Sequence, residues 1–127
     1  MELNEYQEKA MSTCMDSCNN FSYMFINLVG EIGEFASKLA KEIRKDHLFI
    51  GGKYEGGLQN ILNINPDNLP PLTLSDELKK EAGDILWQLS GLCSVMGWNL
   101  EDVAQKNLDK LASRKKRGVI DGSGDNR

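Results

Sequence analysis

Residues 28–36 carry two glutamates, Glu31 and Glu34, inside an otherwise apolar run. Residues three apart project from neighbouring points of one helix face, so this spacing predicts a pair of carboxylates side by side. A second pair at the same spacing, Glu81 and Asp84, lies in a later apolar run. A chain that packs both runs into one core must therefore accommodate four acids next to that core.

Apolar residues recur at three- and four-residue steps in four segments, which is the period of an amphipathic α-helix. The segments cover residues 3 to about 18, 21 to 45, 75 to 96 and 100 to 115. No segment shows a convincing alternation typical of a strand. The sequence therefore predicts an all-α fold, a bundle of four main helices.

The ends of these segments carry residues that terminate helices. Either Asn19 or Asn20 is expected to cap the second helix, Ser75 the third and Asn99 the fourth. Gly97 suits the C-terminus of the third helix, where a left-handed backbone is common. These residues give the predicted helices defined boundaries.

Length and composition indicate one domain. The 127 residues, 40% hydrophobic and 27% charged, suit a globular chain with a single core. Residues 47–73 are rich in glycine, asparagine and proline and predict a long loop, with a short helix or strand at residues 58–64. We expect one all-α domain over residues 1–118 and a C-terminal tail over residues 119–127.

Charge and cysteine content exclude several classes of protein. The net charge of −4 argues against nucleic acid as the main partner. No apolar run is long enough for a membrane helix, and the N-terminus lacks the pattern of a secretory signal. Three cysteines predict reduced thiols in a cytoplasmic protein. Zinc is not expected, since His47 is the only histidine.

The four acids predict a metal site if they converge. Clustered carboxylates repel one another and need a cation to stay ionised together. Ligands that are all oxygen suit Mg²⁺, with Mn²⁺ as a substitute, and magnesium commonly shares its coordination with substrate phosphates. A di-iron carboxylate bundle would require histidines beside the acids, and the sequence has none there.

The alternative is that both acidic pairs lie on solvated helix faces. Glu34 would then pair with Lys38, and Glu81 with Lys79 or Lys80. Two glycines between the acids, at positions 33 and 83, favour the metal site, because glycine in a helix interior indicates close helix approach. The residues by themselves leave both interpretations open.

The acidic motifs resemble those of a known family. Gly30-Glu31-Ile32-Gly33-Glu34, followed by Glu81-Ala82-Gly83-Asp84, is similar to the EExxE, spacer, ExxD signature of MazG-like all-α nucleoside triphosphate pyrophosphohydrolases. Gly30 replaces the first glutamate, as in the shorter dCTP-pyrophosphatase-like members. The similarity extends to Glu5-Tyr6-Gln7 and Asn107-Leu108-Asp109-Lys110, and the tail resembles that of small phage and bacterial relatives.

The resemblance implies Mg²⁺-dependent hydrolysis of a (deoxy)nucleoside triphosphate between the α and β phosphates, for nucleotide pool control or house-cleaning. It implies that Glu31 or Glu34 orients or deprotonates the attacking water. The absence of a glutamate at Gly30 leaves the number of metal ions open. The implied magnesium ligands are Glu31, Glu34, Glu81 and Asp84.

Positive side chains are expected to grip the phosphates opposite the metal. Asn107, Lys110 and Arg114 share one face of the fourth helix and are predicted to make these contacts, unless they only decorate a solvated face. In the tail, Asp125 and Arg127 either close over the site or belong to a disordered segment.

The apolar content of the helices, together with the family resemblance, predicts a homodimer or homotetramer. Trp87 and Trp98 either stack on a nucleobase or belong to the core or a subunit interface. Two other functions stay open: a non-catalytic helical interaction module, and a pyrophosphohydrolase of a non-canonical substrate.

Overall fold

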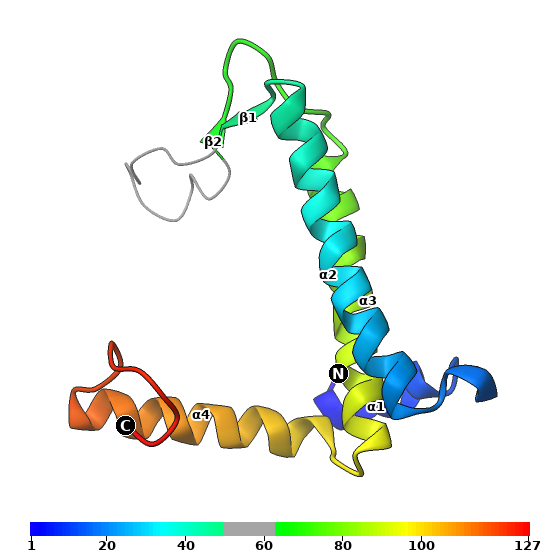
Figure 1. The fold of residues 1–127 in the computed structure, drawn as a ribbon, viewed down its shortest axis with the longest axis vertical. Helices are drawn as coiled ribbons and strands as arrows, with labels where there is room; N and C mark the ends of the chain where they lie inside the picture. Colours follow the sequence, from blue (N-terminus) through cyan, green and yellow to red (C-terminus); the bar gives the residue numbers. More distant parts are fainter. Residues whose placement is uncertain (50–62) are drawn as a thin grey trace. The chain divides into compact units, whose positions relative to one another are not determined.

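Figure 1 shows the computed structural model, which describes residues 1–49 and 63–127. The described residues form four α-helices, so the predicted all-α fold of four helices is confirmed. A short 3₁₀ turn, η1 (Asp16–Cys18), and a two-stranded ladder of β1 (Leu48–Phe49) with β2 (Asn63–Ile64) accompany them. The helices are α1 (Leu3–Met11), α2 (Phe21–Arg44), α3 (Leu74–Val95) and α4 (Leu100–Arg117).

The contacts within the chain group into two compact units. The central unit comprises Phe25–Gln88, and the terminal unit comprises Met1–Met24 with Leu89–Arg127. Helices α2 and α3 each contribute residues to both units. The division into a domain over residues 1–118 and a tail stays a prediction.

The core of the central unit lies between α2 and α3. Leu74 and Leu78, one turn apart on α3, are buried together with Leu48 of β1. Phe35, Leu39 and Ile43 of α2 pack against these three, so the two helices lie side by side, as Figure 1 shows. Burial of apolar side chains at this helical spacing holds the two helices together.

The short ladder extends this core beyond the end of α2. Leu48 pairs with Ile64 and Phe49 with Asn63 in antiparallel register. The sequence did not predict this ladder, because two-residue strands are too short to show an alternating pattern. Most of the predicted element at residues 58–64 lies outside the described residues.

In the terminal unit, buried Gln7 of α1 joins three elements. Its Nε2 donates to Ser94 Oγ and to the Trp98 carbonyl, both at 3.0 Å, and its Oε1 accepts from Leu100 N at 2.8 Å. The side chain thus satisfies a backbone donor at the start of α4, where helical N–H groups lack partners in their own helix. One glutamine connects α1 to the end of α3 and the beginning of α4.

Met24 is fully buried in the terminal unit, against α3. A Cβ atom added at Gly91 would overlap the Met24 thioether. Glycine at position 91 therefore permits the close approach of the two helices. Cys93 is buried nearby, and all three cysteines are free thiols, as predicted.

Two helix boundaries differ from the sequence prediction. The first helix ends at Met11 instead of near residue 18, because the hydroxyls of Ser12 and Thr13 donate to carbonyls of the last turn, both at 2.6 Å. The third helix begins at Leu74, so Ser75 lies within its first turn and not at the cap. The early start places buried Leu74 on the core face.

The other helix ends follow the prediction. Asn20 Oδ1 accepts from Tyr23 N, and Asn99 Oδ1 accepts from Asp102 N, both at 2.9 Å. Gly97 follows α3 with a φ of 71°, in the left-handed region that glycine tolerates. Among the described residues, no helix is both long and apolar enough to span a membrane.

Candidate functional site

Three acids from the two long helices converge in the central unit. Carboxylate oxygens of Glu31 on α2 and of Glu81 and Asp84 on α3 all lie within 4.8 Å of one another. The i, i+3 spacing puts Glu81 and Asp84 on one face of α3, and packing of α2 brings Glu31 to them. We call Glu31, Glu81 and Asp84 the three-carboxylate cluster.

The fourth predicted ligand, Glu34, is not part of this cluster in the structure. Its side chain is exposed, although its charge acts on Glu31. The structure therefore brings three of the four predicted acids together and leaves Glu34 one helical turn from Glu31. The assignment of all four as ligands stays a prediction.

The surroundings of Glu31 disfavour the negative charge of its carboxylate. Burial raises the pKa of Glu31 above its ordinary value, and the negative charges of Asp84, Glu81 and Glu34 raise it further. Asn27 opposes this effect, because its Nδ2 donates to Glu31 Oε1 at 3.2 Å and stabilises the carboxylate. Mutual repulsion of this kind is relieved when a cation joins the acids.

A lysine already supplies part of that positive charge. Lys38 Nζ on α2 lies 3.3 Å from Glu81 Oε1 on α3. The solvated-face alternative predicted ion pairs within each helix, between Lys38 and Glu34 and between Glu81 and a lysine of α3. In the structure, Lys79 Nζ lies 3.8 Å from Asp76 Oδ1 instead. The Lys38–Glu81 ion pair thus runs between the two helices and not within one of them.

The composition of the cluster suits a hard divalent cation. Its ligand atoms are all carboxylate oxygens, which Mg²⁺ and Mn²⁺ prefer over softer metals. Glu31 and Glu81 are half-buried, while Asp84 is exposed. The cluster thus combines two half-buried acids with one that is open to solvent.

The two glycines between the acids do not have the close contacts that were predicted for them. A Cβ added at Gly33 or Gly83 would meet no described atom within 4 Å. The prediction of close helix approach at these positions is therefore wrong for the single chain. In the described part of the chain, no neighbour packs against either glycine.

The predicted phosphate contacts belong to the terminal unit. Asn107 and Lys110 on α4 line a cavity of about 570 Å³. Trp98, at its rim, is 51% exposed, so it is not a core residue of the chain. The remaining lining residues are Gly97, Asn99, Asp102, Val103 and Lys106.

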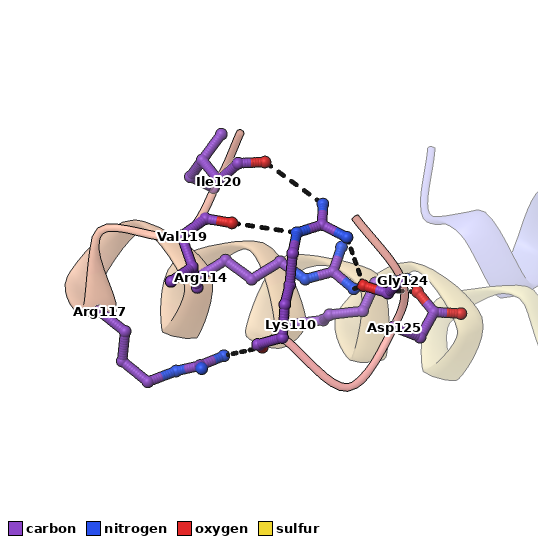
Figure 2. A network of polar contacts seen from close by, with 8 residues as sticks. Lys110, Arg114, Arg117, Val119, Ile120, Gly124 and Asp125 are labelled. Carbon is purple, nitrogen blue, oxygen red and sulfur yellow. Dashed lines mark hydrogen bonds and ion pairs between the residues drawn. The ribbon is translucent and has the colours of Figure 1, made fainter. Parts of the chain in front are cut away.

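Arg114 has a different environment from Lys110 and Asn107. It is only 5% exposed, so the alternative of a solvated face is wrong for this residue. Its Nη2 donates to Asp125 Oδ1 at 2.9 Å, and Lys110 Nζ lies 3.3 Å from the same oxygen (Figure 2). The tail thus folds back on α4, contrary to the alternative of a disordered segment.

One contributor, Asn27, and one set of contacts were missed at the level of sequence. Asn27 stands four residues before Glu31, a helical spacing that predicts the contact between them. Asp125 was named from the sequence, but its contacts with Arg114 and Lys110 were not predicted, because these partners are more than ten residues away and the tail has no periodic pattern.

Comparison with known proteins agrees with this geometry. The MazG nucleotide pyrophosphohydrolase domain matches residues 20–119, a range that includes the three-carboxylate cluster and the predicted phosphate contacts. The chain belongs to the MazG nucleotide pyrophosphohydrolase family, as the resemblance indicated.

Among individual proteins, it is similar to the Gene 37 protein of Mycobacterium phage L5. The two are 37% identical over 135 aligned positions that cover the whole of both chains. No solved structure matches the chain.

Proposed function

We propose that this protein hydrolyses a (deoxy)nucleoside triphosphate between the α and β phosphates, giving the monophosphate and pyrophosphate. The observation that carries the proposal is the convergence of Glu31, Glu81 and Asp84 within 4.8 Å, in a chain of the MazG family. Nucleotide pool control or house-cleaning in the cytoplasm is the role that such a reaction would serve.

The cofactor in this proposal is Mg²⁺, with Mn²⁺ as a substitute. Glu31, Glu81 and Asp84 would hold it, with Glu34 as the fourth ligand. When bound, the ion would supply positive charge that screens the triphosphate. The raised pKa of Glu31 supports this assignment, because a site that already disfavours three negative charges gains most from a cation.

Glu31 or Glu34 serves as the general base in this scheme. The carboxylate accepts a proton from water as the water oxygen attacks the α-phosphorus. The bond from the α-phosphorus to the bridging oxygen breaks, and pyrophosphate leaves with that electron pair.

Asn107, Lys110 and Arg114 are proposed to contact the phosphates. An amide, an ammonium and a guanidinium offer the donors that phosphate oxygens require. These contacts come either from the same subunit or from a neighbouring one, because we propose a homodimer or homotetramer. In support, Ile26, Val29 and Ile32 on α2 are 67%, 59% and 51% exposed, more apolar surface than one helix face usually shows to solvent.

A panel of canonical and modified triphosphates tests the proposal. Incubation with Mg²⁺ in ¹⁸O-labelled water should release pyrophosphate and place the label in the nucleoside monophosphate, since the water attacks the α-phosphorus. Label in the pyrophosphate, or release of inorganic phosphate alone, would contradict the proposed bond cleavage. The panel also separates canonical from non-canonical substrates.

Glu34→Gln tests the assignment of the acids. The change keeps the size of the side chain and removes its charge, so turnover should fall by about 10²–10⁴-fold if Glu34 is a base or ligand. Glu8→Gln on the exposed face of α1 is the matched control and should retain full activity. Full activity of Glu34→Gln would remove Glu34 from the site. An interaction module would show no turnover and no stabilisation by millimolar Mg²⁺.

A further inference from the structure

The tail presents a negative charge to the two cations that we assign to phosphate binding. Asp125 Oδ1 accepts from Arg114 Nη2 at 2.9 Å and lies 3.3 Å from Lys110 Nζ, as Figure 2 shows. Arg114 Nη2 also donates to the Gly124 carbonyl at 3.3 Å. One carboxylate thus occupies the position between an ammonium and a guanidinium where a phosphate oxygen would bind.

Hydrogen bonds from arginine side chains to backbone carbonyls hold the tail in this position. Gly118, with a φ of 70°, ends α4 and reverses the chain. Arg127 then donates from Nε to the Val119 carbonyl at 3.0 Å and from Nη2 to the Ile120 carbonyl at 3.3 Å. Arg117 Nη2 donates to the Arg127 carbonyl at 2.6 Å. The tail therefore closes on itself, and Asp125 reaches α4 as part of a defined loop.

The carboxylate does not satisfy the guanidinium completely. Arg114 is 5% exposed, and its Nε is buried without a hydrogen-bond acceptor among the described residues. A buried donor without a partner is unfavourable. Nε and Nη2 share the edge of the guanidinium that binds two oxygens at once, and Asp125 gives it only one. A phosphate group placed there offers an oxygen to each nitrogen.

Asp125 is also the contact that is easiest to displace. Its side chain is 83% exposed, so little packing holds it. Arg114 and Lys110 keep the pKa of Asp125 below its usual value, so it is ionised at neutral pH and carries one negative charge. Inorganic pyrophosphate carries more than one, and attraction to the same two cations increases with that charge.

We propose that Asp125 acts as an internal competitor that occupies the Lys110–Arg114 oxyanion site until a phosphate group displaces it. The proposal rests on the assignment of these two cations to phosphate binding. It adds a regulatory contact, because the tail weakens the binding of phosphate groups and must release α4 before they bind.

Isothermal titration with inorganic pyrophosphate in the presence of EDTA tests this directly, since metal-dependent binding is then absent. Asp125→Asn should bind pyrophosphate about two- to fivefold more tightly than the unaltered protein, the size expected for removal of an exposed ion pair. Asp121→Asn is the matched control, because it removes the same charge from the same tail outside the contact with α4. It should leave the affinity unchanged.

Three results would overturn the proposal. They are equal affinity of Asp125→Asn and the unaltered protein for pyrophosphate, an equal gain of affinity in Asp121→Asn, and no pyrophosphate binding by the unaltered protein or by Asp125→Asn. A second measurement follows the ¹⁵Nε–¹H resonance of Arg114, assigned through its loss in Arg114→Lys. Pyrophosphate should shift this resonance, because Nε gains an acceptor. An unchanged resonance at saturation would place the anion elsewhere and contradict the proposal.

These measurements do not depend on turnover, so they test the role of Asp125 separately from the proposed hydrolysis. If the protein hydrolyses no triphosphate and Asp125→Asn still binds pyrophosphate more tightly, the proposed function fails and the competitor stands. If the protein does hydrolyse triphosphates, Asp125→Asn should lower KM about two- to fivefold at unchanged kcat. Turnover with an unchanged KM would leave the proposed function intact and remove the competitor.

Discussion

Lys38 Nζ lies 3.3 Å from Glu81 Oε1, so α2 brings to the three-carboxylate cluster both an acid, Glu31, and a cation that partly neutralises it. The side chain of Glu81 is 16% exposed and that of Lys38 36% exposed, so this pair is more sheltered than an ordinary surface ion pair. A divalent ion that enters the cluster must compete with this ammonium group for an oxygen of Glu81.

Replacing Lys38 with methionine should therefore strengthen the binding of Mg²⁺. The ion pair contributes about 0.2–1 kcal/mol, so the apparent affinity for Mg²⁺ should rise by up to about fivefold. Without metal, the variant should unfold at a lower temperature, because three acids then lack a counter-charge. Thermal unfolding in EDTA and across an Mg²⁺ titration measures both effects. Lys41→Met, one turn along α2 and outside the cluster, should change neither.

Glu31→Gln should remove a pH dependence from the stability of the metal-free protein. The pKa of Glu31 is raised in the folded state, so its contribution to stability is greatest at acid pH and is lost as pH rises through that pKa. Urea unfolding in EDTA over a pH series should show a weaker decline for Glu31→Gln than for the unaltered protein.

With Mg²⁺ present the sign reverses, because the metal requires the deprotonated carboxylate. Stabilisation of the unaltered protein by Mg²⁺ should grow with pH, and Glu31→Gln should lose most of it. The same Mg²⁺ stabilisation in both proteins would show that Glu31 is not a ligand.

Gln7→Ala should destabilise the terminal unit. The change leaves the Leu100 N–H without its side-chain acceptor in a buried position, which costs about 1–3 kcal/mol. Chemical unfolding gives the loss of free energy directly. Gln105→Ala, an exposed glutamine on α4, should cost less than about 0.5 kcal/mol. Equal effects of the two changes would mean that Gln7 is not the connection between α1, α3 and α4.

Alanine at two glycines should have opposite effects. Gly91→Ala forces a Cβ against buried Met24 and should cost about 1–3 kcal/mol. Gly33→Ala meets open space in the single chain and should stabilise α2 by up to about 1 kcal/mol, because alanine is the better helix former. The free energy of unfolding of each variant measures these two effects. A destabilised Gly33→Ala with an altered oligomeric state would show that a second subunit packs at this position.

Sequence reasoning recovered the long helices well, because α2, α3 and α4 are amphipathic over several turns and carry recognisable ends at Asn20, Gly97 and Asn99. It failed where the deciding interaction is short or local. The hydroxyls of Ser12 and Thr13 end α1 early, and the β1–β2 ladder is too brief to carry a period.

In the candidate site, the i, i+3 spacing was enough to predict that Glu81 and Asp84 share a helix face. The same spacing suggested that Glu31 and Glu34 would both join the cluster. Among the described residues, Glu31 joins Glu81 and Asp84 in the cluster and Glu34 does not. The rotation of one helix against another is set by side-chain packing, which a helical period does not specify.

Helical periodicity and a short signature are enough to predict the fold class, the family and the acids available to hold a metal. Which charges meet depends on the packing of the helices. Lys38 pairs with Glu81 of another helix, and Asp125 pairs with Arg114 where the tail folds back on α4. Such contacts depend on how helices pack and where the chain reverses, and therefore leave no periodic trace in the sequence.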